Sequence, residues 1–266
     1  MRQTPLSSNR VETDRRFRLF LRSSSVLAWQ LVVVSIASNA PAQSGFLTSP
    51  QELLAMDPAA FVEWLDSNRP KPMAPEERAR IFGSLPRQGR RTRFDASARQ
   101  KVAGMQGFLR AAGRDSTYEI LVVEAPQVRI GLYARRVILV SEPVLKLLDV
   151  AELQAQLAHE TGHVYPWGDD APASAMNSRR AKDLELWCDA IALATLHRLR
   201  LDPSRLMTGV EKITRYNWKF DENVDESNYP TLAERRRYAR EVIAWLERGS
   251  RPSHKLRVSP YRIAPA

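Results

Sequence analysis

The stretch DVAELQAQLAHETGHVYP, residues 149–166, decides how the rest of this chain is interpreted. At its centre, His159, Glu160 and His163 form an HExxH motif. Side chains four residues apart on an α-helix share one face, so two imidazole nitrogens can reach the same Zn²⁺. Glu160 then lies close enough to polarise a water on the metal. The motif predicts a zinc site, and the alternative is two surface His on an amphipathic helix.

The same stretch carries signals for both ends of a helix. Asp149, followed three residues later by Glu152, is typical of a capping box, in which the two side chains accept hydrogen bonds from each other's backbone N–H. Pro166 has no backbone N–H and clashes with a preceding helical turn. We therefore expect one helix that begins after Asp149 and does not continue past Tyr165.

A third protein ligand is needed to complete a catalytic zinc site. Glu185 lies 22 residues after His163, within the next strongly helical segment, Lys182–Leu199. Asp189 lies four residues further along the same helical face, where its carboxylate can accept the second ring N–H of a ligand His. We expect Glu185 as the ligand and Asp189 behind it, in preference to Asp183, which lies elsewhere around the helix.

Length and composition indicate one folded domain with additional helices. The 266 residues include 44% hydrophobic residues, enough for one large core. The formal net charge is +10, but residues 1–42 hold six Arg and two acidic residues, a net of +4, which leaves +6 for the remainder. We therefore expect no nucleic-acid partner, whereas peripheral contact with an anionic membrane surface stays an option. The single Cys188 excludes an internal disulfide.

Both ends of the chain differ in character from the middle. Residues 1–43 are typical of a signal peptide, because Arg residues precede an apolar stretch and Ala40-Pro41-Ala42 offers a cleavage site before Gln43. We expect export to the periplasm or secretion, and the alternative is anchoring by an uncleaved N-terminal segment. Residues 251–266 are basic and contain three prolines, which is typical of an extended arm.

Residues 44–94 are expected to form an N-terminal helical extension that ends in a basic linker. Three short helices are expected there, beginning at Pro50, Pro58 and Glu76. The cluster Arg87–Arg93 then reads RQGRRTR, which is typical of a solvated connection.

Residues 95–250 carry the clear β signals of the chain and are expected to form the catalytic domain. Three segments are rich in β-branched and aromatic residues: Tyr118–Glu124, Val128–Tyr133 and Arg136–Ser141. Ala134-Arg135 provides a tight turn between the last two. The predicted fold class is α+β and mainly helical, with a small β-sheet packed on the HExxH helix.

The run VILVSEPVLKLLDVAELQAQLAHETGHVY, followed by ELWCDAIA, resembles the gluzincin family of HtpX, the CAAX prenyl protease and periplasmic BepA-type proteases. The resemblance covers residues 118–240 and implies a zincin-like core with one Zn²⁺ per chain. It implies these site residues: His159, His163 and Glu185 as zinc ligands, Glu160 as general base and Asp189 behind the ligands.

The chain also departs from the family pattern. HtpX-like members carry membrane helices, and we expect none here after residue 43. Arg235 matches a family Arg, whereas Tyr229 stands where the family has His. The resemblance implies that Tyr229 or Arg235 stabilises a developing oxyanion, and the alternative for Tyr229 is a packing role. Arg129-Ile130-Gly131 stands near the place of the family's Asn-Ala-Phe substrate strand, which leaves substrate preference open.

Together these features predict a zinc metalloendopeptidase that hydrolyses peptide bonds of exported or misfolded proteins. An extended polypeptide substrate could add to the sheet edge near Val128–Tyr133. Two alternatives stay open: a catalytically silent zincin-fold scaffold of the cell envelope, and a zinc amidase with a non-protein substrate.

Overall fold

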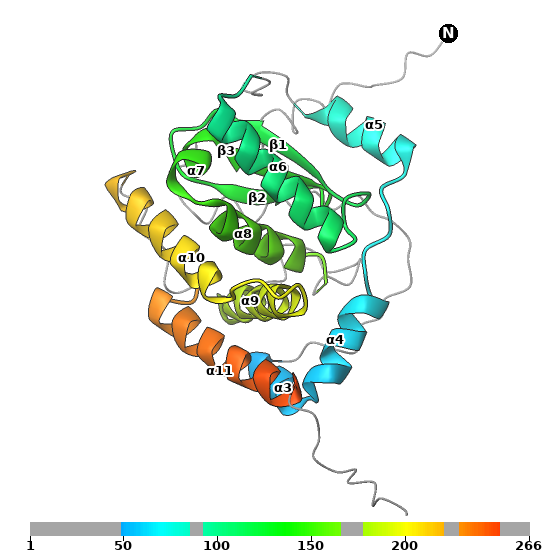
Figure 1. Ribbon diagram of the computed structural model, residues 1–266, viewed down its shortest axis with the longest axis vertical. Helices are drawn as coiled ribbons and strands as arrows, with labels where there is room; N and C mark the ends of the chain where they lie inside the picture. Colours follow the sequence, from blue (N-terminus) through cyan, green and yellow to red (C-terminus); the bar gives the residue numbers. More distant parts are fainter. Residues whose placement is uncertain (1–48, 86–92, 166–177, 221–228, 251–266) are drawn as a thin grey trace, which may run out of the picture.

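The computed structural model describes residues 49–85, 93–165, 178–220 and 229–250. The expected signal peptide, most of the basic linker, the loop after Pro166 and the basic tail lie outside these ranges. Within them, no helix is long and apolar enough to cross a membrane. The described chain is mainly helical with one small mixed sheet, as the sequence predicts (Figure 1).

The sheet has three strands in the order β1-β3-β2. The central strand β3, Val137–Ser141, pairs in parallel with β1, Glu119–Val123, and antiparallel with β2, Ile130–Tyr133. All three expected strands are thus present, each one or two residues shorter than expected. Because β3 is central, β1 and β2 are the two edges of the sheet.

The turn between β2 and β3 lies at the predicted residues. Ala134 and Arg135 both have positive φ, 48° and 59°, as the central residues of a type I′ turn require. The Arg136 N–H donates to the Tyr133 carbonyl oxygen over 3.0 Å, and the register then pairs Tyr133 with Val137. The connection therefore contains Arg136 in addition to the two central residues of the turn.

The two faces of the sheet bury different side chains. One face packs on α6, Ala96–Ala111, and on the helices beneath it, through Val122, Ile138 and Val140. The opposite face packs on α5, Pro75–Ser84, where Val123, Tyr133 and Leu139 join a smaller cluster. A sheet buried on both sides needs apolar residues at successive positions, and all five residues of β3 are buried.

Most of the remaining helices lie below the sheet in Figure 1, whereas α7 lies beside β3. Their bounds are α3 Pro50–Ala55, α4 Pro58–Ser67, α7 Glu142–Leu147, α8 Val150–Gly162, α9 Ser178–Arg198, α10 Ser204–Asn217 and α11 Leu232–Ser250, with the 3₁₀ turn η2 at Trp218–Phe220. The α9 helix contacts α8 and α11 most extensively. It thereby occupies the centre of this helical part.

The N-terminal helices share the main core. The Phe61 ring of α4 lies 6.1 Å from the Trp187 ring of α9 and 5.6 Å from the Trp245 ring of α11, measured between ring centroids. The Tyr238 hydroxyl donates to the Pro50 carbonyl oxygen over 3.1 Å. The three proline-marked helices of this segment are present as expected, and α3 and α4 are packed into the same apolar cluster as α8 and α9.

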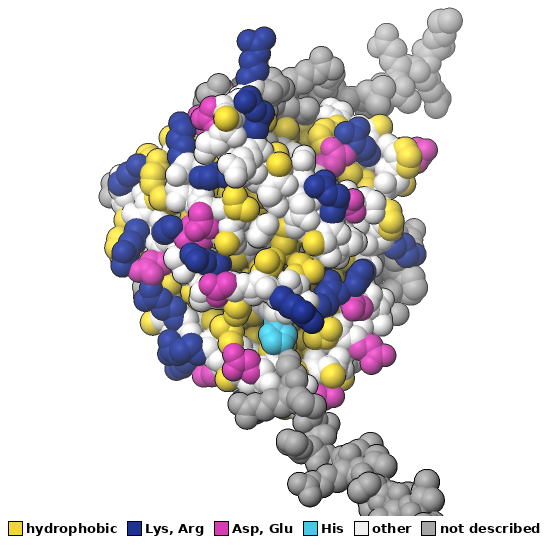
Figure 2. Space-filling model, viewed as in Figure 1, with side chains coloured by type: hydrophobic (Ala, Val, Ile, Leu, Met, Phe, Trp, Pro, Cys, Tyr) yellow, Lys and Arg dark blue, Asp and Glu magenta, His cyan; other side chains and the backbone are white. Residues whose placement is uncertain are grey.

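Charged side chains of both signs are interspersed over the face shown in Figure 2, with apolar side chains between them. On this face, the described cations thus lie among acidic neighbours. Contact with an anionic membrane surface stays a prediction.

Candidate metal centre

The HExxH helix, α8, begins as the sequence predicts. The Asp149 carboxylate accepts a hydrogen bond from the Glu152 N–H over 2.8 Å, and Glu152 accepts one from the Asp149 N–H over 2.9 Å. Glu152 is fully buried and also pairs with Lys212, with 2.7 Å between Nζ and Oε1. This capping box fixes the first residue of α8, and therefore the direction in which each later side chain points.

The end of α8 agrees with the expectation that the helix does not continue past Tyr165. The helix ends at Gly162, and His163 is its C-cap residue, with φ −58° and ψ −15°. Its N–H donates to the Glu160 carbonyl oxygen over 3.3 Å, the tighter spacing often seen in a last turn. Because these angles are close to helical, His163 stays on the same face as His159.

Gly162 allows α8 and α9 to cross closely at this point. A Cβ atom at Gly162 would lie 3.2 Å from both the Cα and the carbonyl oxygen of Cys188, which are backbone atoms that cannot rotate away. The glycine in the motif is therefore explained by the space that α9 occupies.

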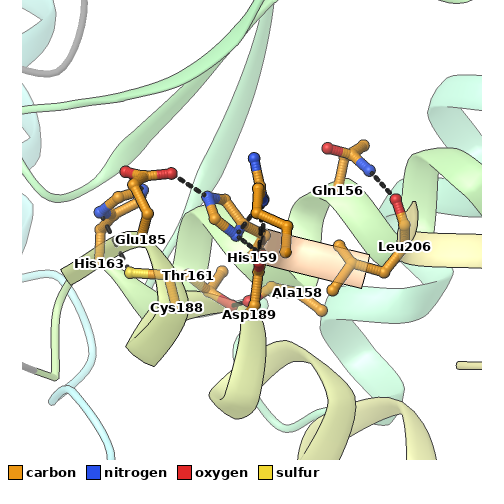
Figure 3. A network of polar contacts seen from close by, with 10 residues as sticks. Gln156, Ala158, His159, Thr161, His163, Glu185, Cys188, Asp189 and Leu206 are labelled. Atoms are coloured by element: carbon orange, nitrogen blue, oxygen red, sulfur yellow. Dashed lines mark hydrogen bonds and ion pairs between the residues drawn. The ribbon is translucent and has the colours of Figure 1, made fainter. Parts of the chain in front are cut away.

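Glu185 lies between the two His side chains (Figure 3). Its Oε2 is 3.4 Å from Nε2 of His159, and its Oε1 is 3.7 Å from Nε2 of His163. Ligand atoms about 2.0–2.2 Å from a tetrahedral Zn²⁺ lie about 3.3–3.6 Å from each other. The three side chains thus have the donor types of a zinc site, and each imidazole–carboxylate distance is close to that between two ligands of one zinc ion.

The other ring nitrogen of each His is also engaged. Nδ1 of His159 lies 2.9 Å from Oδ1 of Asp189, and Nδ1 of His163 lies 3.2 Å from Sγ of Cys188 (Figure 3). When Nδ1 carries the proton, Nε2 has a free lone pair for a metal. Both His are therefore held with Nε2 towards Glu185.

Sequence reasoning placed Asp189 correctly behind His159 but assigned Cys188 only to the core. A signal for Cys188 existed, because it follows Glu185 by three residues and so lies on the same helical face. Its thiol is fully buried, and burial raises its pKa well above the usual value, so the neutral thiol faces His163.

Arg235 contacts the carboxylate that lies behind His159. Its Nε and Nη2 donate to Oδ2 and Oδ1 of Asp189 over 2.8 Å and 2.6 Å, and Nη2 lies 3.5 Å from Nδ1 of His159. The guanidinium therefore lies on the Nδ1 side of His159 and holds Asp189. An oxyanion role for Arg235 stays a prediction.

Tyr229 is buried and lies two residues before Thr231, which caps α11. The Thr231 N–H donates to Glu234 over 2.6 Å, and Thr231 Oγ1 accepts from the Glu234 N–H over 3.2 Å. This second capping box, which the sequence analysis missed, fixes the start of the helix that carries Arg235. An oxyanion role for Tyr229 stays a prediction.

Glu160 is half-buried beside the metal-binding face. One ligand atom each from His159, Glu160 and His163 lie within 4.8 Å of one another, so a second carboxylate adjoins the His pair. Burial raises the pKa of Glu160 to about 7, with the Glu185 charge acting in the same direction and His159 opposing it. Glu185 is the better ligand of the two, since each of its oxygens faces a different Nε2.

The two His residues differ in charge when no metal is bound. Burial alone would lower the pKa of His159, but hydrogen bonds to Asp189 and Glu185 outweigh it and raise the pKa to about 10. Burial lowers the pKa of His163 to about 4, which Glu185 only partly offsets. Asp189 has its pKa lowered to about 2, because Arg235 and His159 outweigh the effect of burial. At neutral pH the centre thus holds one imidazolium and one neutral imidazole.

A scan against models of protein families and a search of curated proteins both returned no match, so the resemblance to gluzincins rests on the motif residues of the sequence.

Proposed function

We propose that this chain is a zinc-dependent metalloendopeptidase with a zincin-like core of the gluzincin type. The observation that carries the proposal is the convergence of the two Nε2 atoms on Glu185, at 3.4 Å and 3.7 Å, while both Nδ1 atoms have other partners. A pair of surface His would need neither a buried carboxylate between them nor a partner behind each ring.

The residues present fit a zinc ion in type and in spacing, with His159, His163 and Glu185 as the three protein ligands. Zn²⁺ bound there would lower the pKa of a water towards ~7 and polarise a substrate carbonyl. Glu160, which adjoins the His pair, is suited to accept a proton from that water and to pass it to the leaving amine. Asp189 and Arg235 keep the His159 ring in place throughout.

A polypeptide is the substrate that the surroundings favour. The β2 strand is an edge of the sheet and contacts α8, the helix that carries HExxH. An extended chain added to this edge would gain main-chain hydrogen bonds with little selection for its side chains. That chemistry suits unfolded or exported proteins of varied sequence.

The test is metal content and casein cleavage by the full chain, by Glu160→Gln and by Glu247→Gln. Glu247 is an exposed residue of α11, so Glu247→Gln is a matched control for the loss of one carboxylate. We expect one zinc in all three proteins and cleavage only in the wild type and the control. Turnover by Glu160→Gln would exclude Glu160 as the base, and absence of zinc would exclude the metal centre itself. Zinc without any cleavage would favour the scaffold or the non-protein amidase.

A further inference from the structure

His163, the second expected zinc ligand, lies just beyond the last residue of α8, Gly162. Its N–H donates to the Glu160 carbonyl oxygen over 3.3 Å, and the Tyr165 N–H donates to the Gly162 carbonyl oxygen over 3.1 Å. Both bonds span three residues instead of the regular four, and helix ends held in this way fray readily. The position of the His163 backbone therefore depends on contacts from outside α8.

One buried guanidinium joins the residues on either side of His163. Nη1 of Arg114 donates to Oγ1 of Thr161, two residues before His163, and Nη2 donates to the Tyr165 hydroxyl, two residues after it, over 2.9 Å. The Thr161 hydroxyl itself donates to the Ala158 carbonyl oxygen over 3.0 Å. Arg114 is 3% exposed and Thr161 is fully buried. Because a guanidinium is planar and rigid, its two bonds fix how Thr161 and Tyr165 lie relative to each other.

The end of α6 explains why Arg114 reaches α8. Gly113 has a φ of +66°, the Arg114 N–H donates to the Leu109 carbonyl oxygen over 2.8 Å, and the Gly113 N–H donates to that of Arg110 over 2.9 Å. These two bonds and the left-handed glycine form a Schellman motif, which turns the chain back over the last turn of a helix. Since α6 packs on α8, the motif places the Arg114 side chain against α8.

The guanidinium contacts α8 on the side away from the expected ion. Thr161 is two residues from both His159 and His163, about half a turn around the helix. Among the described residues, the side-chain partners of Arg114 are these two neutral hydroxyl groups. A buried cation without a counter-charge costs folding free energy, so stability alone does not explain this residue. The C-terminal end of α8, where carbonyl groups carry partial negative charge, favours a cation at this position.

We propose that Arg114 is a positioning residue for the metal centre, because it holds Thr161 and Tyr165 together and thereby keeps His163 where its Nε2 faces Glu185. The proposal rests on the proposed function for the metal itself and adds a residue that acts through the backbone of the ligand. The 3.7 Å between Nε2 of His163 and Oε1 of Glu185 is the distance that this contact maintains.

Backbone amide exchange of the metal-free proteins tests the positioning role without zinc and without turnover. In Arg114→Met, the amides of His163 and Tyr165 should exchange about 3- to 10-fold faster, because hydrogen bonds that hold this end of α8 are lost. The Leu153 amide, which donates to the Asp149 carbonyl oxygen in the first turn of α8, should keep its exchange rate. Equal acceleration of all three amides would show a general loss of stability and overturn the proposal, as would unchanged exchange at His163.

Zinc competition on the same variants connects this end of α8 to the metal. If His163 occupies the competent position for only part of the time in Arg114→Met, zinc affinity should fall by the same factor, about 3- to 10-fold. Tyr165→Phe removes one of the two acceptors and should weaken zinc binding about 2- to 5-fold. The double variant should bind zinc no more weakly than Arg114→Met, because both changes remove the same contact. Arg110→Met, which replaces an exposed Arg of α6, is the matched control and should keep wild-type affinity.

Wild-type zinc affinity in Arg114→Met, or additive losses in the double variant, overturns the proposal. If Arg114→Met does not fold, Tyr165→Phe decides by the same two measurements, since it removes a single oxygen atom. A wild type that binds no zinc, with exchange at His163 still dependent on Arg114, would refute the proposed metal centre and leave the contact at the end of α8 standing. Zinc binding that neither variant changes would refute the positioning role and leave the metal centre standing.

Discussion

Replacing Asp189 should change both the stability of the fold and the affinity for zinc, and a second variant can separate the two effects. Asp189 is fully buried, and its carboxylate accepts from Arg235 over 2.6 Å and 2.8 Å and lies 2.9 Å from Nδ1 of His159. Replacing Asp189 with Asn leaves the buried guanidinium without its counter-charge, which costs about 3–5 kcal/mol for such pairs. Removing the partner behind a ligand His weakens metal binding by about 10- to 100-fold.

A double variant distinguishes the two effects. In Asp189→Asn with Arg235→Met, no buried cation is left unpaired, so most of the lost stability should return. Zinc affinity should not return, because His159 still lacks a carboxylate on Nδ1. The two roles of Asp189 thus predict that stability recovers in the double variant and that zinc affinity does not.

The assays are urea unfolding of the metal-free proteins and zinc competition with a chromophoric chelator. Asp189→Asn should lower the urea midpoint by about 1–2.5 M, given a loss of about 3–5 kcal/mol and a slope of about 2–3 kcal/mol per M. In the double variant, the urea midpoint should return most of the way to the wild-type value, and the zinc affinity should stay weakened. Wild-type zinc affinity in the double variant would refute the role of Asp189 in holding His159.

Three further outcomes follow from the same centre. Cys188→Ala should weaken zinc binding about tenfold. Cys188→Ser keeps a polar partner for His163, so its zinc affinity should lie closer to that of the wild type. Equal zinc affinities in all three proteins would show that the thiol does not orient His163. Gly162→Ala should lower the melting temperature and the zinc affinity, because the added Cβ meets α9 backbone at 3.2 Å, and an unchanged protein would contradict that close crossing. Zinc binding at pH 8 should release at least one proton, since His159 has a pKa of about 10 and is protonated there whereas His163 is neutral. Zinc affinity should therefore rise with pH. Calorimetry in two buffers of different ionisation enthalpy would contradict this if it showed no proton release.

Much of the fold and of the metal centre was predictable because its determinants are local. The capping box at Asp149, the four-residue spacing of His159 and His163, and the spacing of Glu185 and Asp189 each depend on the geometry of a single helix. The strands and their tight turn were also predictable, since β-branched runs and a two-residue connection act over a few residues. Such features can be predicted without knowing which other elements pack against them.

The tertiary structure decided which side chains from different elements meet. Arg235 bonds Asp189 across 46 residues, Cys188 meets His163 across 25, and Asn217 bonds Val128 across 89. The order β1-β3-β2, which makes β2 an open edge, is likewise a property of the assembled sheet. Sequence spacing fixes the face of a helix on which a residue lies, but the partner depends on how α8, α9, α10 and α11 cross. That crossing is set by the packing of the whole core, to which many distant side chains contribute at once.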